Sequence, residues 1–184
     1  MEYEIRVARA EDVGAISKLI VSSARGLSQN DYTDEQIEAA VSSIFGVDSE
    51  LIDDETYFVA EARGELIGCG GWSRRRTLFG GDQAASREPG LLDPTQDAAK
   101  IRAFFVHPKW ARRGVGRAIL ERCEEEAQRA RFCALELMST LPGLGFYRKM
   151  GYEASEPILY PAGAIELKFV PMRKHFGVSR KVAQ

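Results

Sequence analysis

The sequence has few of the residues that build metal centres or disulfide frameworks. Its 184 residues include three cysteines and two histidines. Cys69, Cys123 and Cys133 form an odd set and lack the close spacing of zinc ligands. Reduced, buried thiols fit this pattern better than a disulfide scaffold. We therefore expect no metal site and the reducing environment of a cytoplasm.

Long hydrophobic runs and an excess of either charge are also missing. No apolar stretch approaches the roughly 18 residues that a membrane-spanning helix needs, and the opening Met-Glu-Tyr-Glu-Ile is not a basic-then-apolar leader. The formal net charge is -2, from 25 Lys and Arg against 27 Asp and Glu. Such a balance produces no global positive field. We expect neither nucleic acid nor a membrane as a partner.

What is present is the composition of one ordinary globular domain. Hydrophobic residues make up 45% and charged residues 28%, near the averages for such domains. The length suits one core better than two cores joined by a linker. We predict a single domain over residues 1–184, with a core over about 4–170, a long loop over 73–99 and a basic tail over 171–184.

The first part of the chain shows signals for one strand and two helices. Residues 4–8 alternate polar and apolar, as in a half-buried strand, and Asp12 stands where the N-cap of a following helix is expected. Thr33 and Gln36 have the spacing of a capping box at the start of a second helix.

A hairpin and an irregular segment come next. Residues 56–61 and 65–72 read as strands on either side of Arg63-Gly64, a turn signal. Between residues 73 and 99 the periodicity is lost, and Gly and Pro pairs recur. A connection of that length is typical of a functional or mobile loop.

The remaining elements centre on a strand, a glycine turn and a helix. Residues 100–106 form a strand that Pro108 stops, and a long helix is predicted over about 115–131. A strand over 134–138 and a short helix over about 143–150 follow, and one or two closing strands end the domain.

The glycine turn has the chemistry of an anion site. Gly114 and Gly116 would let a phosphate approach the unpaired N–H groups at the start of the helix. Arg112, Arg113 and Arg117 add local positive charge. The turn is not a dinucleotide fingerprint, because Ile119 occupies the third glycine position, and it lacks the Gly-Lys-Ser/Thr of a P-loop. A tight strand-to-helix turn with no ligand is the remaining alternative.

Two segments resemble one family. Phe-Phe-Val-His-Pro followed by Ala-Arg-Arg-Gly-Val-Gly-Arg resembles the acyl-CoA-binding motif of the GNAT superfamily of N-acetyltransferases, with Ala111 in place of the usual Gln or Arg. The Phe-Tyr-x-x-x-Gly-Tyr of residues 146–152 resembles the late helix of that family, and Tyr147 matches the tyrosine that approaches the cofactor sulfur. Thr140 stands where many members have Asn.

The resemblance implies a fold and a cofactor. The fold is a mixed α/β domain with six or seven mostly antiparallel strands, splayed between the fourth and fifth, and about four helices on the two faces. The cofactor is acetyl-CoA, with no metal. The residues that the resemblance assigns to cofactor binding are Phe104, Phe105, Val106, Arg112, Arg113, Gly114, Val115, Gly116, Arg117, Thr140 and Tyr147.

The implied reaction is direct attack of an amine on the acetyl thioester. A lysine-like amine with a pKa of about 10.4 is only about 0.1% neutral near pH 7.4, so removal of a proton should help. A backbone amide near Val106 would stabilise the developing oxyanion. Tyr147, a neutral donor at this pH, would protonate the departing thiolate; a core aromatic is the alternative for this residue.

A general base is harder to assign. Strict alternation places no carboxylate on the strand face where some members of the family carry their base; that face would hold Lys100, Arg102, Phe104 and Val106. Glu61, at the end of the preceding hairpin strand, is our candidate base. The alternative for Glu61 is a solvated charge at a strand end.

Two residues are candidates for substrate binding. Arg102 lies within an apolar strand, where an unpaired charge is costly, so it is expected either to bind a substrate carboxylate or to form an internal ion pair, for instance with the long loop. Trp72 could line the acceptor pocket, or the segment 72–76 could form a solvated basic sheet edge.

The sequence therefore predicts an N-acetyltransferase that acts on a primary amine of a small molecule, because the long loop is expected to cover the acceptor side. Acetylation of protein N-termini or lysines is a rival prediction. A non-catalytic acyl-CoA-binding sensor is another: the missing strand carboxylate leaves it open, and the presence of Tyr147 argues against it. A homodimer is compatible with the family.

Overall fold

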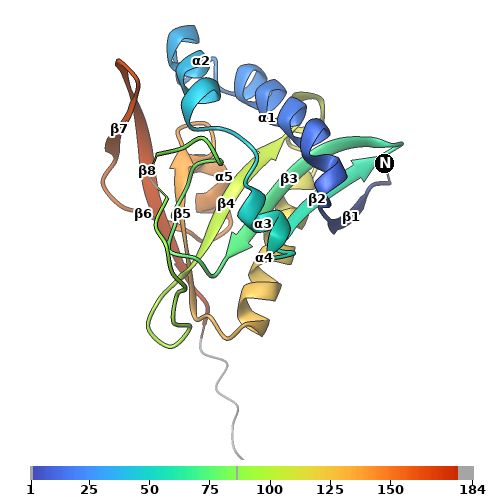
Figure 1. The fold of residues 1–184 in the computed structure, drawn as a ribbon, viewed down its shortest axis with the longest axis vertical. Helices are drawn as coiled ribbons and strands as arrows, with labels where there is room; N and C mark the ends of the chain where they lie inside the picture. Colours follow the sequence, from blue (N-terminus) through green and yellow to red (C-terminus); the bar gives the residue numbers. More distant parts are fainter. Residues whose placement is uncertain (1, 86, 178–184) are drawn as a thin grey trace, which may run out of the picture.

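The computed structural model describes residues 2–85 and 87–177, which form one sheet with helices on both of its faces (Figure 1). The strands are β1 Glu4–Val7, β2 Tyr57–Ala62, β3 Glu65–Ser73, β4 Ala99–Val106, β5 Ala134–Thr140, β6 Glu153–Ala154, β7 Ile158–Ala162 and β8 Ile165–His175. The α-helices are α1 Val13–Leu27, α2 Asp34–Ser43, α3 Ser49–Asp53, α4 Val115–Arg129 and α5 Leu144–Lys149, and the short 3-10 turns are η1 Ala10–Asp12 and η2 Pro108–Trp110.

The sheet is antiparallel except at its centre. Its strand order is β1-β2-β3-β4-β5-β8-β6, with β7 paired to β8, and β4 and β5 run parallel. These two strands are paired only where Ala99–Ile101 face Leu135–Leu137. Beyond Ile101 they separate, which confirms the predicted splay. The described residues form eight strands and five α-helices, more than the six or seven strands and about four helices expected.

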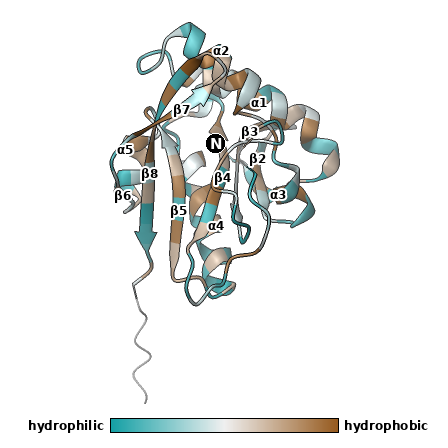
Figure 2. Ribbon diagram, turned by 60° about the vertical axis from the view of Figure 1, so that its left-hand side comes forward, coloured by the Kyte–Doolittle hydropathy of each residue, from teal (hydrophilic) through white to brown (hydrophobic). Residues whose placement is uncertain are grey.

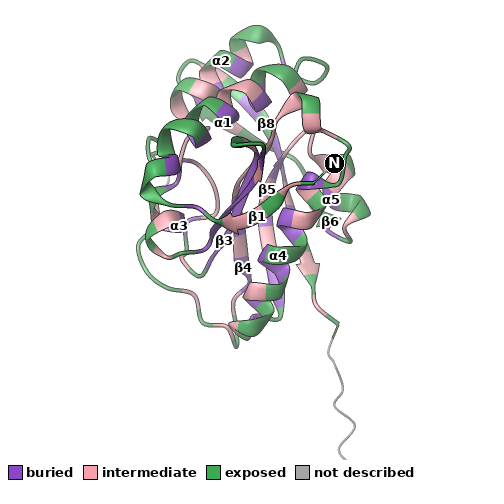
Figure 3. Ribbon diagram, turned by 90° about the vertical axis from the view of Figure 1, so that its right-hand side faces the viewer, coloured by how far each residue is buried: buried purple, intermediate pink, exposed green. Residues whose placement is uncertain are grey.

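The helices divide between the two faces of the sheet. One core cluster joins α4 and α5 to the sheet, for example through Ile119, Leu120 and Tyr147. The clusters on the other face include Ile16 of α1 and Ile37 of α2. Figure 2 shows hydrophobic residues along β4 and β5, and Figure 3 shows the buried residues concentrated between the helices and the sheet.

Several local signals are confirmed and one is wrong. Thr33 Oγ1 accepts a hydrogen bond from Gln36 N at 3.2 Å, and Gln36 Oε1 accepts one from Thr33 N at 3.1 Å, as a capping box requires. Gly151 has a φ of 87° after α5, a conformation that glycine adopts without strain. The predicted basic tail begins too early, because residues 171–175 belong to β8 and pair with β5. Its last part, residues 178–184, lies outside the described residues.

A β-bulge in β4 overturns the predicted alternation of its side chains. Ala103 has a φ of 50°, and the register with β3 shifts between Cys69 and Gly71. The bulge adds a residue to one strand and so reverses the faces beyond it. Arg102 therefore faces the α1 and α3 side of the sheet, whereas Phe104 packs with the α4 cluster.

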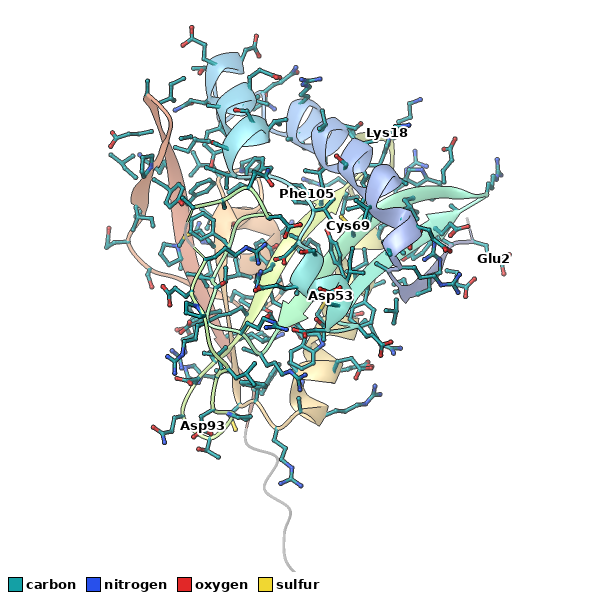
Figure 4. The ribbon with its side chains drawn as sticks, viewed as in Figure 1. Glu2, Lys18, Asp53, Cys69, Asp93 and Phe105 are labelled. Carbon is teal, nitrogen blue, oxygen red and sulfur yellow. The ribbon has the colours of Figure 1, made fainter. Side chains whose placement is uncertain are left out.

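Beyond the bulge, alternate residues of β4 face opposite helices. Val106 packs with Phe104 on the α4 side, while Phe105 packs with the α1 cluster. In Figure 4, Phe105 and Cys69 lie beneath α1, and Lys18 points outward from that helix. β4 thus presents side chains to both sides of the sheet at the point where the sheet opens.

The long connection between β3 and β4 is tied to the domain. Arg75 donates to both carboxylate oxygens of Asp54 at 2.7 Å, and Arg87 pairs with Glu50 at 2.6 Å. A single bridge joins Arg75 to Leu91. These contacts anchor the segment across the face of the sheet that carries α3.

Candidate active site

The separation of β4 from β5 opens a cavity of about 720 Å³ that reaches both faces of the sheet. Its walls come from α1, the connection after α2, the long loop, β4, the glycine turn, β5 and α5. This volume is within the usual range for a small-molecule site. The cavity brings together all of the predicted cofactor residues except Arg113 and Val115.

The glycine turn lies at one end of the cavity. Arg112 and Gly114 have φ values of 65° and 87°, and Gly114 is the N-cap of α4. Successive amides in such a turn and at a helix start point outward and attract an anion. A Cβ atom added at Gly116 would lie 3.5 Å from Val106 Cγ2 and 3.6 Å from the Phe146 ring. A side chain at position 116 would therefore fill the cradle from which a ligand reaches the backbone.

Tyr147 lies in the wall of the cavity beside the splayed strand. Its ring contacts Phe104 edge-on, with 6.1 Å between centroids, and Tyr152 at 5.7 Å. Burial raises the pKa of Tyr147 above the usual tyrosine range, because a low-dielectric surrounding disfavours the phenolate. The hydroxyl is thus protonated at neutral pH and able to donate.

The backbone amide of Val106 already has a partner, which the sequence did not predict. Val106 N donates to Ser23 Oγ at 3.3 Å, and Ser23 is buried in α1 and lines the cavity. A ligand carbonyl at this amide would share or replace that long bond. The sequence signal for Ser23 was its position on the buried stripe of α1 after Ile16 and Ile20, where an apolar residue is expected.

Arg102 is held by internal ion pairs. Its guanidinium is completely buried and pairs with the buried carboxylate of Asp48 and, at 3.2 Å, with Glu50. The predicted alternative of an internal ion pair is therefore present, with partners before α3 and within it. Arg87 of the long loop contacts the same two carboxylates. Binding of a substrate carboxylate by Arg102 stays a prediction, and it would compete with this network.

Removing the partner of Arg102 should destabilise the fold. We expect Asp48→Asn to lower the free energy of unfolding by about 3–5 kcal/mol, because it leaves a buried charge without its closest counter-ion. Burial raises the pKa of Asp48, and Arg102 and Arg87 oppose that shift. Urea denaturation measures the loss. As a control, Glu38→Gln removes an exposed pair with Arg25 and should change the free energy far less; equal losses would contradict the assigned role of Asp48.

Glu61 and Trp72 lie outside the cavity lining. The Glu61 carboxylate pairs with Arg6 at 2.9 Å, and the Trp72 ring is buried against Phe132, with 6.1 Å between centroids. Neither residue is among those that line the cavity. The roles of Glu61 as general base and of Trp72 in the acceptor pocket therefore stay predictions, and the geometry favours neither of them.

Charge in the cavity wall is of one sign. The charged lining residues are Arg102, Arg112, Arg117 and Lys149. Of the described residues that line the cavity, none is an aspartate or glutamate. Arg112 and Arg117 make their end of the cavity suited to an anionic ligand. The described lining residues include no carboxylate that could accept a proton from a substrate.

Metal-ligand clusters and membrane-spanning helices are both absent from the described residues. Across residues 2–85 and 87–177, no group of three His, Cys, Asp or Glu side chains is arranged to hold a metal ion. Within the same ranges, none of the helices has the length and apolar character required to cross a bilayer.

Comparison with known families gives one match in sequence. The model of the acetyltransferase (GNAT) domain matches residues 53–154, more than half of the chain. This range contains the glycine turn, the splayed strand and Tyr147. No curated protein matches the chain in sequence.

Solved structures show the same fold. A GCN5-related N-acetyltransferase from Rhodopseudomonas palustris has a TM-score of 0.71 and 22% identity, over 96% of this chain and 97% of that one. PaiA N-acetyltransferase from Thermoplasma acidophilum, in complex with coenzyme A, has a TM-score of 0.66 and 16% identity, over 96% and 100%. The putative acetyltransferase yncA from Salmonella typhimurium, with its cofactor acetyl-CoA, has a TM-score of 0.61 and 16% identity, over 95% and 94%.

Proposed function

The chain belongs to the GNAT acetyltransferase family, and from this premise we propose that it transfers the acetyl group of acetyl-CoA to a primary amine of a small molecule. The observation that carries the proposal is the single cavity that joins the glycine turn to Tyr147 across the opening between β4 and β5. Structural neighbours hold coenzyme A or acetyl-CoA, which supports the choice of cofactor.

The cofactor residues have separate tasks in this proposal. Amides of the turn from Arg112 to Gly116 and the charge of Arg117 would hold the pyrophosphate. The backbone of β4 from Phe104 to Val106 would bind the pantetheine arm, with Thr140 on the facing strand. Arg113 stacks its guanidinium on Trp110, 5.7 Å from the ring centroid, beside the same turn.

The chemistry needs three events at the thioester. The amine nitrogen forms a bond to the carbonyl carbon, the N–H of Val106 or a neighbouring amide stabilises the negative charge on the carbonyl oxygen, and the bond from carbon to sulfur breaks. Tyr147 would give its phenolic proton to the sulfur and regain one, through solvent, from the substrate nitrogen, which loses a proton as the amide forms. Coenzyme A supplies the activated acetyl group and leaves as a thiol.

The described part of the cavity wall provides no obvious general base to deprotonate the amine. Of the described residues that line the cavity, none carries a carboxylate, so we propose that the amine binds in its neutral form or loses its proton to water. The rate should then follow the small neutral fraction of the amine. A Glu61→Gln variant that lost activity without a change in stability would instead establish Glu61 as the base.

Two rival functions have specific tests. A protein acetyltransferase needs an open groove. The long loop contributes Phe79, Gly80 and Gly81 to the cavity wall, which favours a small acceptor. A non-catalytic acyl-CoA sensor would bind the cofactor and turn over no amine. The Tyr147 hydroxyl in the cavity wall favours an enzyme.

Calorimetric titration with acetyl-CoA, followed by thiol release with a panel of amines, tests the proposal. We expect micromolar binding and amine-dependent release of coenzyme A. Binding without turnover of any amine would favour the sensor, and absence of binding would remove the basis for both functions.

A further inference from the structure

The end of the cavity that faces α1 and the long loop is walled by aromatic rings. Phe45, Phe79 and Phe105 line it and are each partly exposed. Phe45 contacts Phe105 edge-on, with 5.6 Å between centroids, and Phe79 contacts Phe169 at 5.7 Å. Rings that pack on one another form a preformed apolar surface. A ligand with a branched apolar chain would be buried against this surface, and an aromatic ligand would also gain favourable ring contacts.

Two hydrogen bonds to backbone carbonyls hold the part of the long loop that carries Phe79. Gly81 N donates to the carbonyl of Ile44 at 2.8 Å, and Gln83 Nε2 donates to the carbonyl of Phe45 at 2.8 Å. These bonds join the long loop to the segment after α2 that carries Phe45. The cavity therefore has a side wall at this end, which limits an acceptor to a compact body.

This end of the cavity offers no free charge. Asp48 and Glu50 neutralise Arg102, and the lining also carries the hydroxyls of Ser23 in α1 and of Ser28, which follows α1. An ammonium group would lose its hydration here without a carboxylate to replace it, and a substrate carboxylate would find no unpaired cation.

We propose that the acceptor is a primary amine on a small aromatic or branched apolar body, with no carboxylate, phosphate or second ammonium group. This inference rests on the proposed acetyl transfer and specifies its acceptor. The body packs among Phe45, Phe79 and Phe105, and the neutral nitrogen points to the opening between the strands. The nitrogen bonds to the acetyl carbon there, and the displaced sulfur takes the proton of Tyr147.

A panel of acceptors tests the proposal on the wild-type protein. Thiol release from acetyl-CoA is measured with 2-phenylethylamine, with L-phenylalanine, which adds a carboxylate to the same body, with spermidine and with a short alanine-led peptide. We expect the kcat/KM for 2-phenylethylamine to exceed each of the others at least about tenfold, as loss of one apolar contact or burial of one unpaired charge would produce.

Matched variants then locate the acceptor. Phe79→Ala should lower the kcat/KM for 2-phenylethylamine by about 10- to 100-fold and leave the Kd for acetyl-CoA unchanged, because the ring lies away from the glycine turn. Leu78→Ala removes a comparable side chain from the same loop but outside the cavity lining, and it should change neither value.

Failure of the inference and failure of the function are distinguishable. If spermidine, phenylalanine or the peptide is acetylated faster than 2-phenylethylamine, the proposed acceptor class is wrong while acetyl transfer stands. If Phe79→Ala behaves like Leu78→Ala, the acceptor does not bind among these rings. If acetyl-CoA does not bind and no amine is acetylated, both proposals fail.

Discussion

Tyr147→Phe should lower kcat by about 10²- to 10⁴-fold, the usual contribution of a positioned general acid, while the Kd for acetyl-CoA stays unchanged. The substitution removes one hydroxyl and keeps the ring, and hence its packing against Phe104 and Tyr152. Single-turnover measurements of thiol release would separate this loss of chemistry from any change in product release.

Tyr152→Phe is the matched control. Its hydroxyl donates a hydrogen bond to Glu124 Oε1 at 3.1 Å, and Tyr152 does not line the cavity. We expect some loss of stability from the broken buried hydrogen bond, and an unchanged kcat. If the variant at Tyr147 also keeps the wild-type kcat, water or another donor protonates the thiolate and the assignment of Tyr147 is wrong.

The pH profile gives a second test of Tyr147. Because burial raises the pKa of this hydroxyl, the acid stays protonated throughout the neutral and mildly alkaline range. The neutral fraction of the amine rises with pH over the same range. We expect kcat/KM to increase with pH up to at least the ordinary tyrosine range without an alkaline fall; a fall near neutral pH would point to a different acid.

Gly116→Leu should raise the Kd for acetyl-CoA by about 100-fold, equivalent to about 2.8 kcal/mol. The new side chain would enter the space bounded by Val106 and Phe146, at the contacts that a Cβ atom already meets. It would keep a pyrophosphate from the amides at the start of α4, where an anion gains most from the helix terminus. Calorimetric titration measures the change.

Gly14→Leu provides the control for this variant. A Cβ atom at Gly14 meets nothing within 4 Å, and the residue does not line the cavity. It should bind acetyl-CoA as the wild type does. Wild-type affinity in Gly116→Leu would place the cofactor elsewhere. Gly114 is less suitable for this test, because its φ of 87° means that any side chain there also strains the backbone by about 1–2 kcal/mol.

The candidate site was only partly visible in the sequence. The glycine turn and the start of α4, to which we assign the cofactor, are close together in the chain and could be predicted from their residues, whereas Tyr147 was assigned through the resemblance to the GNAT family. The acceptor half of the site could not be predicted. Phe45 and Phe79 both pack on Phe169 because the long loop returns to the segment after α2, and no periodicity in either segment indicates that arrangement.

The side of the sheet on which Arg102 lies was also predicted wrongly from the local alternation of residues. Alternation is a reliable guide only while a strand keeps its period of two, and the positive φ of Ala103 interrupts it. The partner of Arg102 is Asp48, 54 residues away along the chain. An isolated arginine in an apolar strand predicts that some counter-ion exists, but not which one.

The sequence by itself determined the elements whose signals are local: the capping box of Thr33, the hairpin at Arg63-Gly64, and the strand, turn and helix that include Gly116. Tertiary structure alone decided where β4 parts from β5, which face Arg102 takes, and which rings wall the acceptor end. The physical reason is that propensities, caps and turns depend on neighbours along the chain, whereas the shape and charge of a cavity depend on contacts between segments that only folding brings together.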